Sequence, residues 1–121
     1  MADYFEIFNT KLNELMDDMI ATLSLGNEFT VYKTLLNAAM AVDKTAPQRV
    51  FNTTVAIPYE KFIVDRDETF LLSQDYTNIG VEPGLIERLK GVWSQLNNDN
   101  KSAIWKYMQV LIVLNRKCLA C

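Results

Sequence analysis

The feature that most constrains this chain is an apolar run inside its last long stretch, Asn98–Cys121. From Ala103 to Leu114, only Lys106 and Gln109 are clearly polar. A helix that is apolar on nearly all sides is usually buried among other elements. The run is too short and too interrupted to span a bilayer, which needs roughly 20 apolar residues. It therefore predicts a core helix at the centre of the fold, and no membrane span.

The totals describe an ordinary folded domain. The length of 121 residues fits a single helical domain over residues 1–121, and half of the residues are apolar. Histidine is absent, which removes the commonest general base and the commonest metal ligand. The start of the chain is acidic and amphipathic, so we expect no signal peptide. The two cysteines lie together at the C-terminus, and this pattern favours an intracellular reducing compartment.

Charge is distributed unevenly along the chain, although the net charge is only −3. Residues 1–28 contain six acids and one base, whereas residues 100–121 contain four bases and no acid. Opposite charges at the two ends favour one of two arrangements. The first and last helices meet antiparallel within one chain, or chains associate head to tail.

Apolar residues at spacings of three and four predict the first two helices, Asp3–Leu23 and Asn27 to about Val42. Pro47 fits the first turn of a third helix, which continues over Gln48–Ala56. Three consecutive β-branched residues in that segment also allow a strand over Phe51–Ile57. We favour a helix, because the sequence shows no partner strand.

The second half of the chain continues the helical pattern. Pro58 ends the third element and can start a helix to about Leu72, with a weak point around Asp65–Glu68. A polar loop is expected over Ser73–Val81, and Glu82-Pro83-Gly84 opens the next helix.

Asn98 or Asp99 is the expected N-cap of the final helix. The predicted fold is therefore all-α, a compact bundle of five or six helices with the C-terminal helix central.

The two cysteines, Cys118 and Cys121, have the spacing of half a zinc site or of a redox pair. The chain offers no further cysteine and no histidine to complete a zinc site. The dipole at the C-terminal end of a helix would also raise the pKa of a thiol there, which does not suit redox chemistry. We favour two small, semi-apolar residues on a fraying tail, and predict no metal and no cofactor.

A cluster of acids, Asp65, Asp67 and Glu68, could attract a hard cation. The calcium-loop pattern fails, however, because the required glycine and the closing glutamate are missing. A solvated helix face or a helix cap inside the segment is the favoured interpretation. Arg66 lies on the apolar side, so a pair with an acid from another helix is an alternative.

The candidate interaction residues are two tryptophans and the cations of the last helix. Large aromatic residues are enriched at protein interfaces, and they are also ordinary core residues. Arg116 and Lys117 offer a basic end for a partner. Together with Lys101 and Lys106 they span the last helix but are not confined to one face, so they indicate nucleic acid only weakly. The residues of this predicted set are Trp93, Trp105, Lys106, Arg116 and Lys117.

No catalytic constellation is visible in the sequence. A serine or cysteine nucleophile has no histidine to pair with, and no nucleotide-binding glycine motif occurs. We therefore predict neither an enzyme nor a small-molecule substrate.

Several short motifs together resemble a known family. The motifs are Phe51-Asn52, Pro58-Tyr59-Glu60, Arg66-Asp67-Glu68, Phe70-Leu71-Leu72 and Ile104-Trp105-Lys106-Tyr107-Met108-Gln109-Val110-Leu111. With these motifs, most of the chain resembles a family of small uncharacterised helical proteins encoded by large eukaryotic (nucleocytoplasmic) DNA viruses. The resemblance implies a viral origin and a helical fold. It implies no activity, cofactor or catalytic residue.

The expected function is that of a non-enzymatic structural or protein-interaction protein of a large DNA virus. On this expectation it is associated with the virion or located in the infected host cytoplasm, and it self-associates as a homodimer or larger assembly. The alternative is a nucleic-acid-associated accessory factor in viral transcription or packaging.

Overall fold

All regular structure in the described part of the chain is helical. The computed structural model describes residues 3–23, 27–73 and 83–120. Because α3, η1 and α4 follow one another without a break, these ranges contain six continuous helical segments and no strand, which confirms the predicted fold class. All but the first residue of the predicted loop Ser73–Val81 lie outside the described residues. The elements are α1 (Tyr4–Leu23), α2 (Asn27–Val42), α3 (Ala46–Phe51), η1 (Asn52–Ala56), α4 (Ile57–Val64), α5 (Glu68–Ser73), α6 (Pro83–Gln95) and α7 (Asn98–Leu119).

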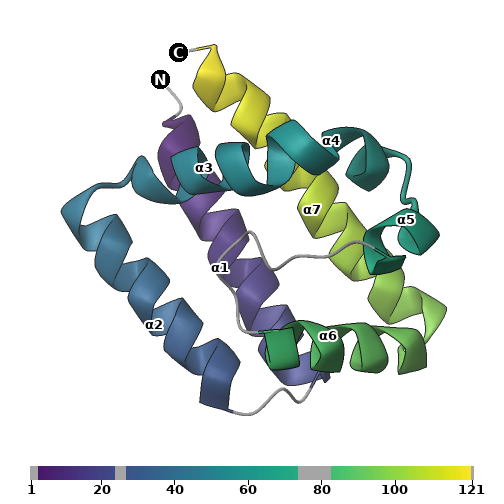
Figure 1. Cartoon of the computed structure of the whole chain (residues 1–121). Helices are drawn as coiled ribbons and strands as arrows, with labels where there is room; N and C mark the ends of the chain where they lie inside the picture. Colours follow the sequence, from purple (N-terminus) through teal and green to yellow (C-terminus); the bar gives the residue numbers. More distant parts are fainter. Residues whose placement is uncertain (1–2, 24–26, 74–82, 121) are drawn as a thin grey trace.

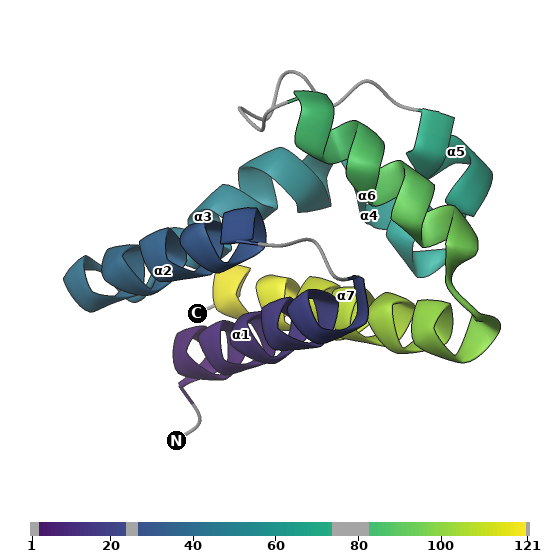
Figure 2. The ribbon, with the colours of Figure 1, turned by 90° about the horizontal axis from the view of Figure 1, so that it is seen from below.

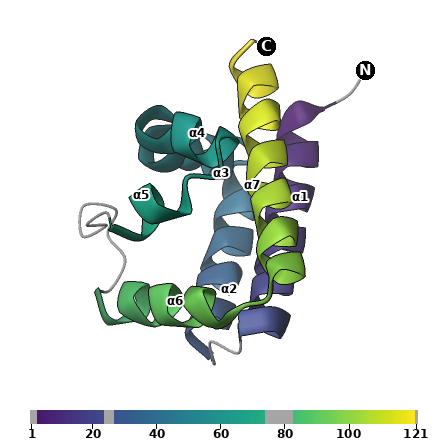
Figure 3. The ribbon, with the colours of Figure 1, turned by 90° about the vertical axis from the view of Figure 1, so that its right-hand side faces the viewer.

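The last helix, α7, is central, as predicted. It packs along α1 and also contacts α3, η1 and α4 (Figure 1). The two long helices α1 and α7 run antiparallel and form one layer, and α3, α4, α5 and α6 lie on one side of that layer (Figures 2 and 3). The antiparallel arrangement is one of the two that the uneven charge distribution predicted. At the end of the layer, the Lys117 Nζ lies 5.2 Å from the ring centroid of Tyr4.

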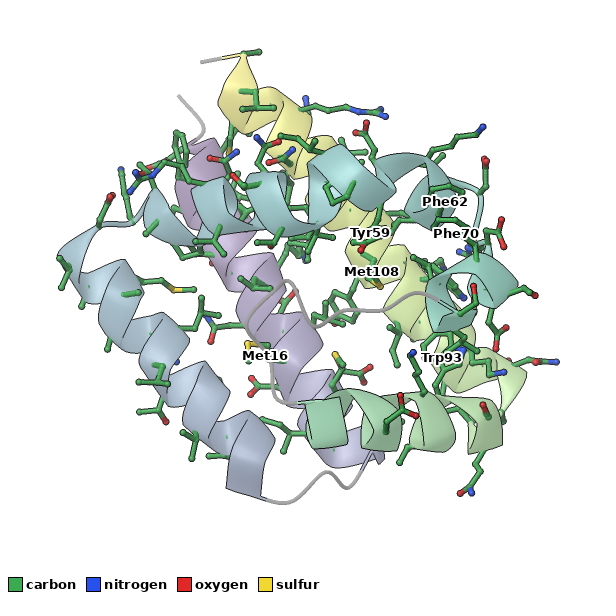
Figure 4. All side chains as sticks on the ribbon, in the orientation of Figure 1. Met16, Tyr59, Phe62, Phe70, Trp93 and Met108 are labelled. Carbon is green, nitrogen blue, oxygen red and sulfur yellow. The ribbon has the colours of Figure 1, made fainter. Side chains whose placement is uncertain are left out.

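Two apolar clusters form the core of the part of the chain that the structure describes, and α7 contributes to both. The larger cluster lies between α1 and α7 and contains Phe8, Leu15, Ile104, Leu111, Leu114 and Cys118. The smaller cluster contains Ala56, Ile63 and Ile112. Tyr59 and Met108 pack against this second cluster and lie near each other in the middle of the fold (Figure 4). Consecutive residues Leu111 and Ile112 therefore join the two clusters through one helix.

The start of α7 differs from the prediction by one residue. The N-cap is Asn97, and not Asn98 or Asp99: its side-chain oxygen accepts a hydrogen bond from the backbone N–H of Asn100 at 2.8 Å. Asn97 has an extended backbone, with φ −71° and ψ 166°, whereas Asn98 is already helical. Only a non-helical residue can turn its side chain back onto the first orphan N–H groups, so the extended residue becomes the cap.

The segment that allowed either a helix or a strand is helical. Its central part, η1, is a π-helix in which the backbone N–H of Ile57 donates to the carbonyl of Asn52. Pro58, the next residue, has no N–H, and in an α-helix its ring would clash with the carbonyl four residues earlier. The wider π-turn before Pro58 removes that clash, so the chain continues from α3 through η1 into α4 without a break.

The helix predicted over Pro58–Leu72 is interrupted at its expected weak point. Helix α4 ends at Val64, α5 begins at Glu68, and Arg66 between them has a φ of 52°. Asp67 then caps α5, because its side-chain oxygen accepts from the backbone N–H of Phe70 at 3.0 Å. The turn folds α5 back so that the Phe62 and Phe70 rings stack with their centroids 3.5 Å apart (Figure 4).

Candidate functional site

The two predicted interaction tryptophans lie against each other inside the fold. The rings of Trp93 in α6 and Trp105 in α7 meet edge to face, with their centroids 5.6 Å apart. Trp105 is only 6% exposed. Trp105 therefore has the core position that was one of its two predicted roles, because α6 encloses its ring on the inner side of α7, and the sequence alone could not place α6 there.

A polar contact completes this tryptophan pair. A carboxylate oxygen of Glu68 in α5 accepts from the Trp93 Nε1 at 2.7 Å and from the Lys101 Nζ at 2.9 Å. The same Lys101 Nζ lies 5.7 Å from the centroid of the Trp93 ring. The bond from Lys101 is the main reason why the pKa of Glu68 lies below its ordinary value. Glu68 thus joins α5, α6 and α7.

Two of the three acids in the predicted cluster, Asp67 and Glu68, make structural hydrogen bonds. Asp67 caps α5, and Glu68 binds Trp93 and Lys101. Within residues 3–23, 27–73 and 83–120, no group of three or more His, Cys, Asp or Glu side chains could hold a metal ion. Arg66 donates to the side-chain oxygens of Ser102 and Gln109, both at 3.3 Å. Both partners are uncharged, so the predicted alternative, a pair between Arg66 and an acid from another helix, is not among these contacts.

The three predicted cations of α7 lie on two sides of the helix: Lys106 and Lys117, about three turns apart, share the side away from α3–α6, whereas Arg116 faces α4. Arg116 pairs with Glu60 of α4, at 2.8 Å between Nε and Oε1. Lys117 lies over the Tyr4 ring, and Lys106 is exposed. These residues therefore do not form one basic surface, and their arrangement gives no added support to nucleic-acid binding.

Cys118, the first of the two cysteines, is 4% exposed in the core cluster between α1 and α7. Cys121 lies outside the described residues. The expectation of a fraying tail is therefore wrong at Cys118, because its side chain is buried among the apolar side chains of α1 and α7.

A buried amide network was missed by sequence reasoning. Asn115 is 2% exposed, its oxygen accepts from the Gln48 Nε2 at 2.7 Å, and its Nδ2 donates to the side-chain oxygen of Asn52 at 3.0 Å. The network joins α7 to α3 and η1. Its only sequence signal is that Asn115 directly follows the apolar run and is itself polar.

One exposed apolar stripe lies on α2. Val31, Leu35 and Val42 are 55%, 61% and 90% exposed, and Ala38 between them is also exposed. Their spacing of four, three and four residues places them on one side of the helix. The apolar spacing that predicts this helix does not by itself separate an outer stripe from an inner one.

A second exposed surface, here called the outer face, is the side of the α1–α7 layer opposite α3–α6. No described helix lies over this side in Figures 2 and 3. Its apolar members, Ile7, Val110 and Val113, are 38%, 41% and 47% exposed. The prediction that residues 103–114 are all core is thus wrong at Val110 and Val113. Lys106 and Lys117 from α7 and Glu6, Thr10, Glu14 and Asp17 from α1 complete the face.

These two surfaces offer apolar contact and charge to another macromolecule. None of the helices in the described ranges is long and apolar enough to cross a membrane. No protein-family model, curated protein or solved structure matches the chain.

Proposed function

We propose that this chain is a non-enzymatic protein-interaction protein that self-associates. The supporting observation is that apolar side chains line up on the outer sides of helices that no other described helix covers. Two such places are the stripe on α2 and the centre of the outer face of α1 and α7. Contiguous exposed apolar surface on a small folded protein marks a contact site for another protein. A second copy of the same chain is the simplest partner, because it is present wherever the chain itself is present.

Light scattering after size-exclusion chromatography tests the proposal. One chain has a mass of 13.9 kDa, so a dimer is separated clearly from a monomer. We expect a mass of at least two chains at micromolar concentration, which falls towards that of one chain on dilution. A mass of one chain at every concentration up to about 100 µM, where a contact worth about 5–6 kcal/mol would be populated, overturns it.

The wider setting of the proposal comes from the viral resemblance. On that basis the chain acts in particles of a large DNA virus or in the cytoplasm of the infected cell. An antibody against the purified chain distinguishes these sites: it detects the protein in purified particles, or only in the lysate of infected cells.

Association with nucleic acid is the second class of function, and no observation on the described surface favours it. It predicts DNA binding that weakens steeply with salt and is reduced when Arg116 and Lys117 are changed to alanine.

A further inference from the structure

The stripe on α2 and the outer face of α1 and α7 differ in how much area they can bury. Helices α1 and α7 have 20 and 22 residues and are therefore about 30 Å long. Two adjacent helices, each about 10 Å wide, present roughly 600 Å² on one side, so two copies facing each other bury about 1,200 Å² in total. This is at the lower limit for a stable interface. The stripe on α2 is one helix wide and about three turns long, so it buries well under half of that area.

The charges on the outer face have opposite signs on its two helices. On α1 the exposed acids are Glu6, Glu14 and Asp17. On α7 the exposed bases are Lys106 and Lys117. Lys11 pairs within α1 with Glu14 at 3.0 Å, and Asp17 pairs with Lys33 of α2. The acids nevertheless remain partly open, since the side chains of Glu14 and Asp17 are 43% and 61% exposed.

This separation of charge distinguishes between the ways in which two copies can meet face to face. A two-fold axis in the plane of the interface and perpendicular to the helices places α1 on α1 of the second copy, so acid faces acid. A two-fold axis parallel to the helices places α1 of each copy on α7 of the other, so acid faces base twice. Both axes make every neighbouring pair of helices antiparallel, as in an up-and-down four-helix bundle, so the charges decide between them.

We propose that the outer face binds a second copy of this chain about a two-fold axis parallel to α1 and α7, forming a four-helix bundle. This inference rests on the proposed self-association and specifies the surface that carries it. The apolar residues Ile7, Val110 and Val113 form the centre of the interface, and the acids of α1 meet the lysines of α7 around it.

The register follows from contacts within one chain. Lys117 lies over Tyr4, so residues of α7 are level with known residues of the antiparallel α1. A two-fold axis parallel to the helices keeps these levels. Lys106, about three turns before Lys117, is therefore level with Glu14 of the second copy. Val113 and Val110, one and two turns before Lys117, are level with Ile7 and Thr10 of the second copy.

Charge reversal at Lys106 tests this geometry, with dimer dissociation measured by sedimentation equilibrium. Lys106→Glu places a glutamate opposite Glu14 at both symmetry-related contacts, and we expect the dissociation constant to rise by about tenfold. The paired change Lys106→Glu with Glu14→Lys restores opposite charges, so the dissociation constant returns to within about threefold of the original. Circular dichroism of each variant checks that the helices are retained.

Two matched controls separate this surface from the others. Lys61→Glu makes the same charge change on an exposed residue of α4, and Leu35→Glu places a charge in the α2 stripe. Both should leave the dissociation constant unchanged. If the chain dimerises but Lys106→Glu has no effect, or the paired change fails to restore binding, this geometry is wrong and self-association stands. If Leu35→Glu alone dissociates the dimer, α2 is the interface. A monomeric parent chain overturns both proposals.

Discussion

Asn115 shows how one polar residue can position a largely apolar helix. Its amide is 2% exposed and bonds to Gln48 and Asn52 on two different helical segments. An amide is satisfied only when both partners are at hydrogen-bond distance, whereas apolar contacts tolerate a range of positions. Asn115 therefore specifies where α3 and η1 lie along α7.

Asn115→Ala should lower the free energy of unfolding by about 1–3 kcal/mol, because it leaves the buried donor of Gln48 without its acceptor. Urea denaturation followed by circular dichroism measures the loss. Asn37→Ala is the matched control, since Asn37 is exposed on α2, and its effect should remain within about 0.5 kcal/mol. Equal effects of the two changes would show that the amide network adds no stability.

Glu68 gives the fold a dependence on pH. Its pKa lies below the ordinary value because Lys101 and Trp93 donate to the charged form. A lowered pKa contributes stability that is present in full above the ordinary glutamate pKa of about 4.3. That stability is lost as the pH falls through the lowered value. Urea denaturation between pH 7 and pH 3 should show this loss in the parent chain.

Glu68→Gln keeps an oxygen that can accept a hydrogen bond from Trp93, but the glutamine side chain stays neutral at every pH. The variant should therefore be less stable than the parent at pH 7, and the difference should shrink as the pH falls below about 4. A difference that stays constant over this range would mean that the carboxylate charge of Glu68 does not contribute.

At the scale of elements, the ends of the helices depend on single residues. The start of α7 depends on Asn97, whose extended backbone lets its side chain reach the N–H of Asn100. Asn97→Ala should cost about 1 kcal/mol in the free energy of unfolding. Asn98→Ala, in the first helical turn, should cost less than about 0.5 kcal/mol, since alanine favours a helix. Thermal denaturation of the two variants decides between the caps, and a larger loss for Asn98→Ala would reverse the assignment.

At the scale of the whole molecule, α7 couples the two core clusters. Leu111 belongs to the cluster with α1, and Ile112 belongs to the cluster with η1 and α4. Because both residues lie on one rigid helix, disruption of either cluster releases the other. The described core should therefore unfold as one cooperative unit.

Leu111→Ala tests this coupling and should cost about 2–5 kcal/mol, because it opens a cavity in a closely packed site. Tryptophan fluorescence and circular dichroism, recorded at one protein concentration, should shift together in urea. Leu119→Ala removes the same atoms from an exposed position of α7 and should cost less than about 1 kcal/mol. Separate transitions by the two probes would show that the clusters unfold independently.

The sequence by itself determined the helical character of the chain and the central place of α7. Apolar residues at spacings of three and four specify a helix locally, and a long apolar run needs burial wherever it lies. The break near Arg66 was predictable from the local sequence as well, because several charged residues in a row and the lack of apolar residues weaken a helix there. These properties depend on neighbours within about one or two turns of the chain.

Only the tertiary structure decided which side of each helix remains open. The same apolar pattern contains Leu111, which is 1% exposed, and Val113, which is 47% exposed. It likewise did not show that Trp105 faces Trp93, or that Asn115 meets Gln48. The physical reason is that the exposure of a residue depends on which distant segments pack against its helix. Among the described helices, α7 has partners beside it and on its inner side, and none on its outer side. The open outer face of α1 and α7 is therefore a property of the assembled fold.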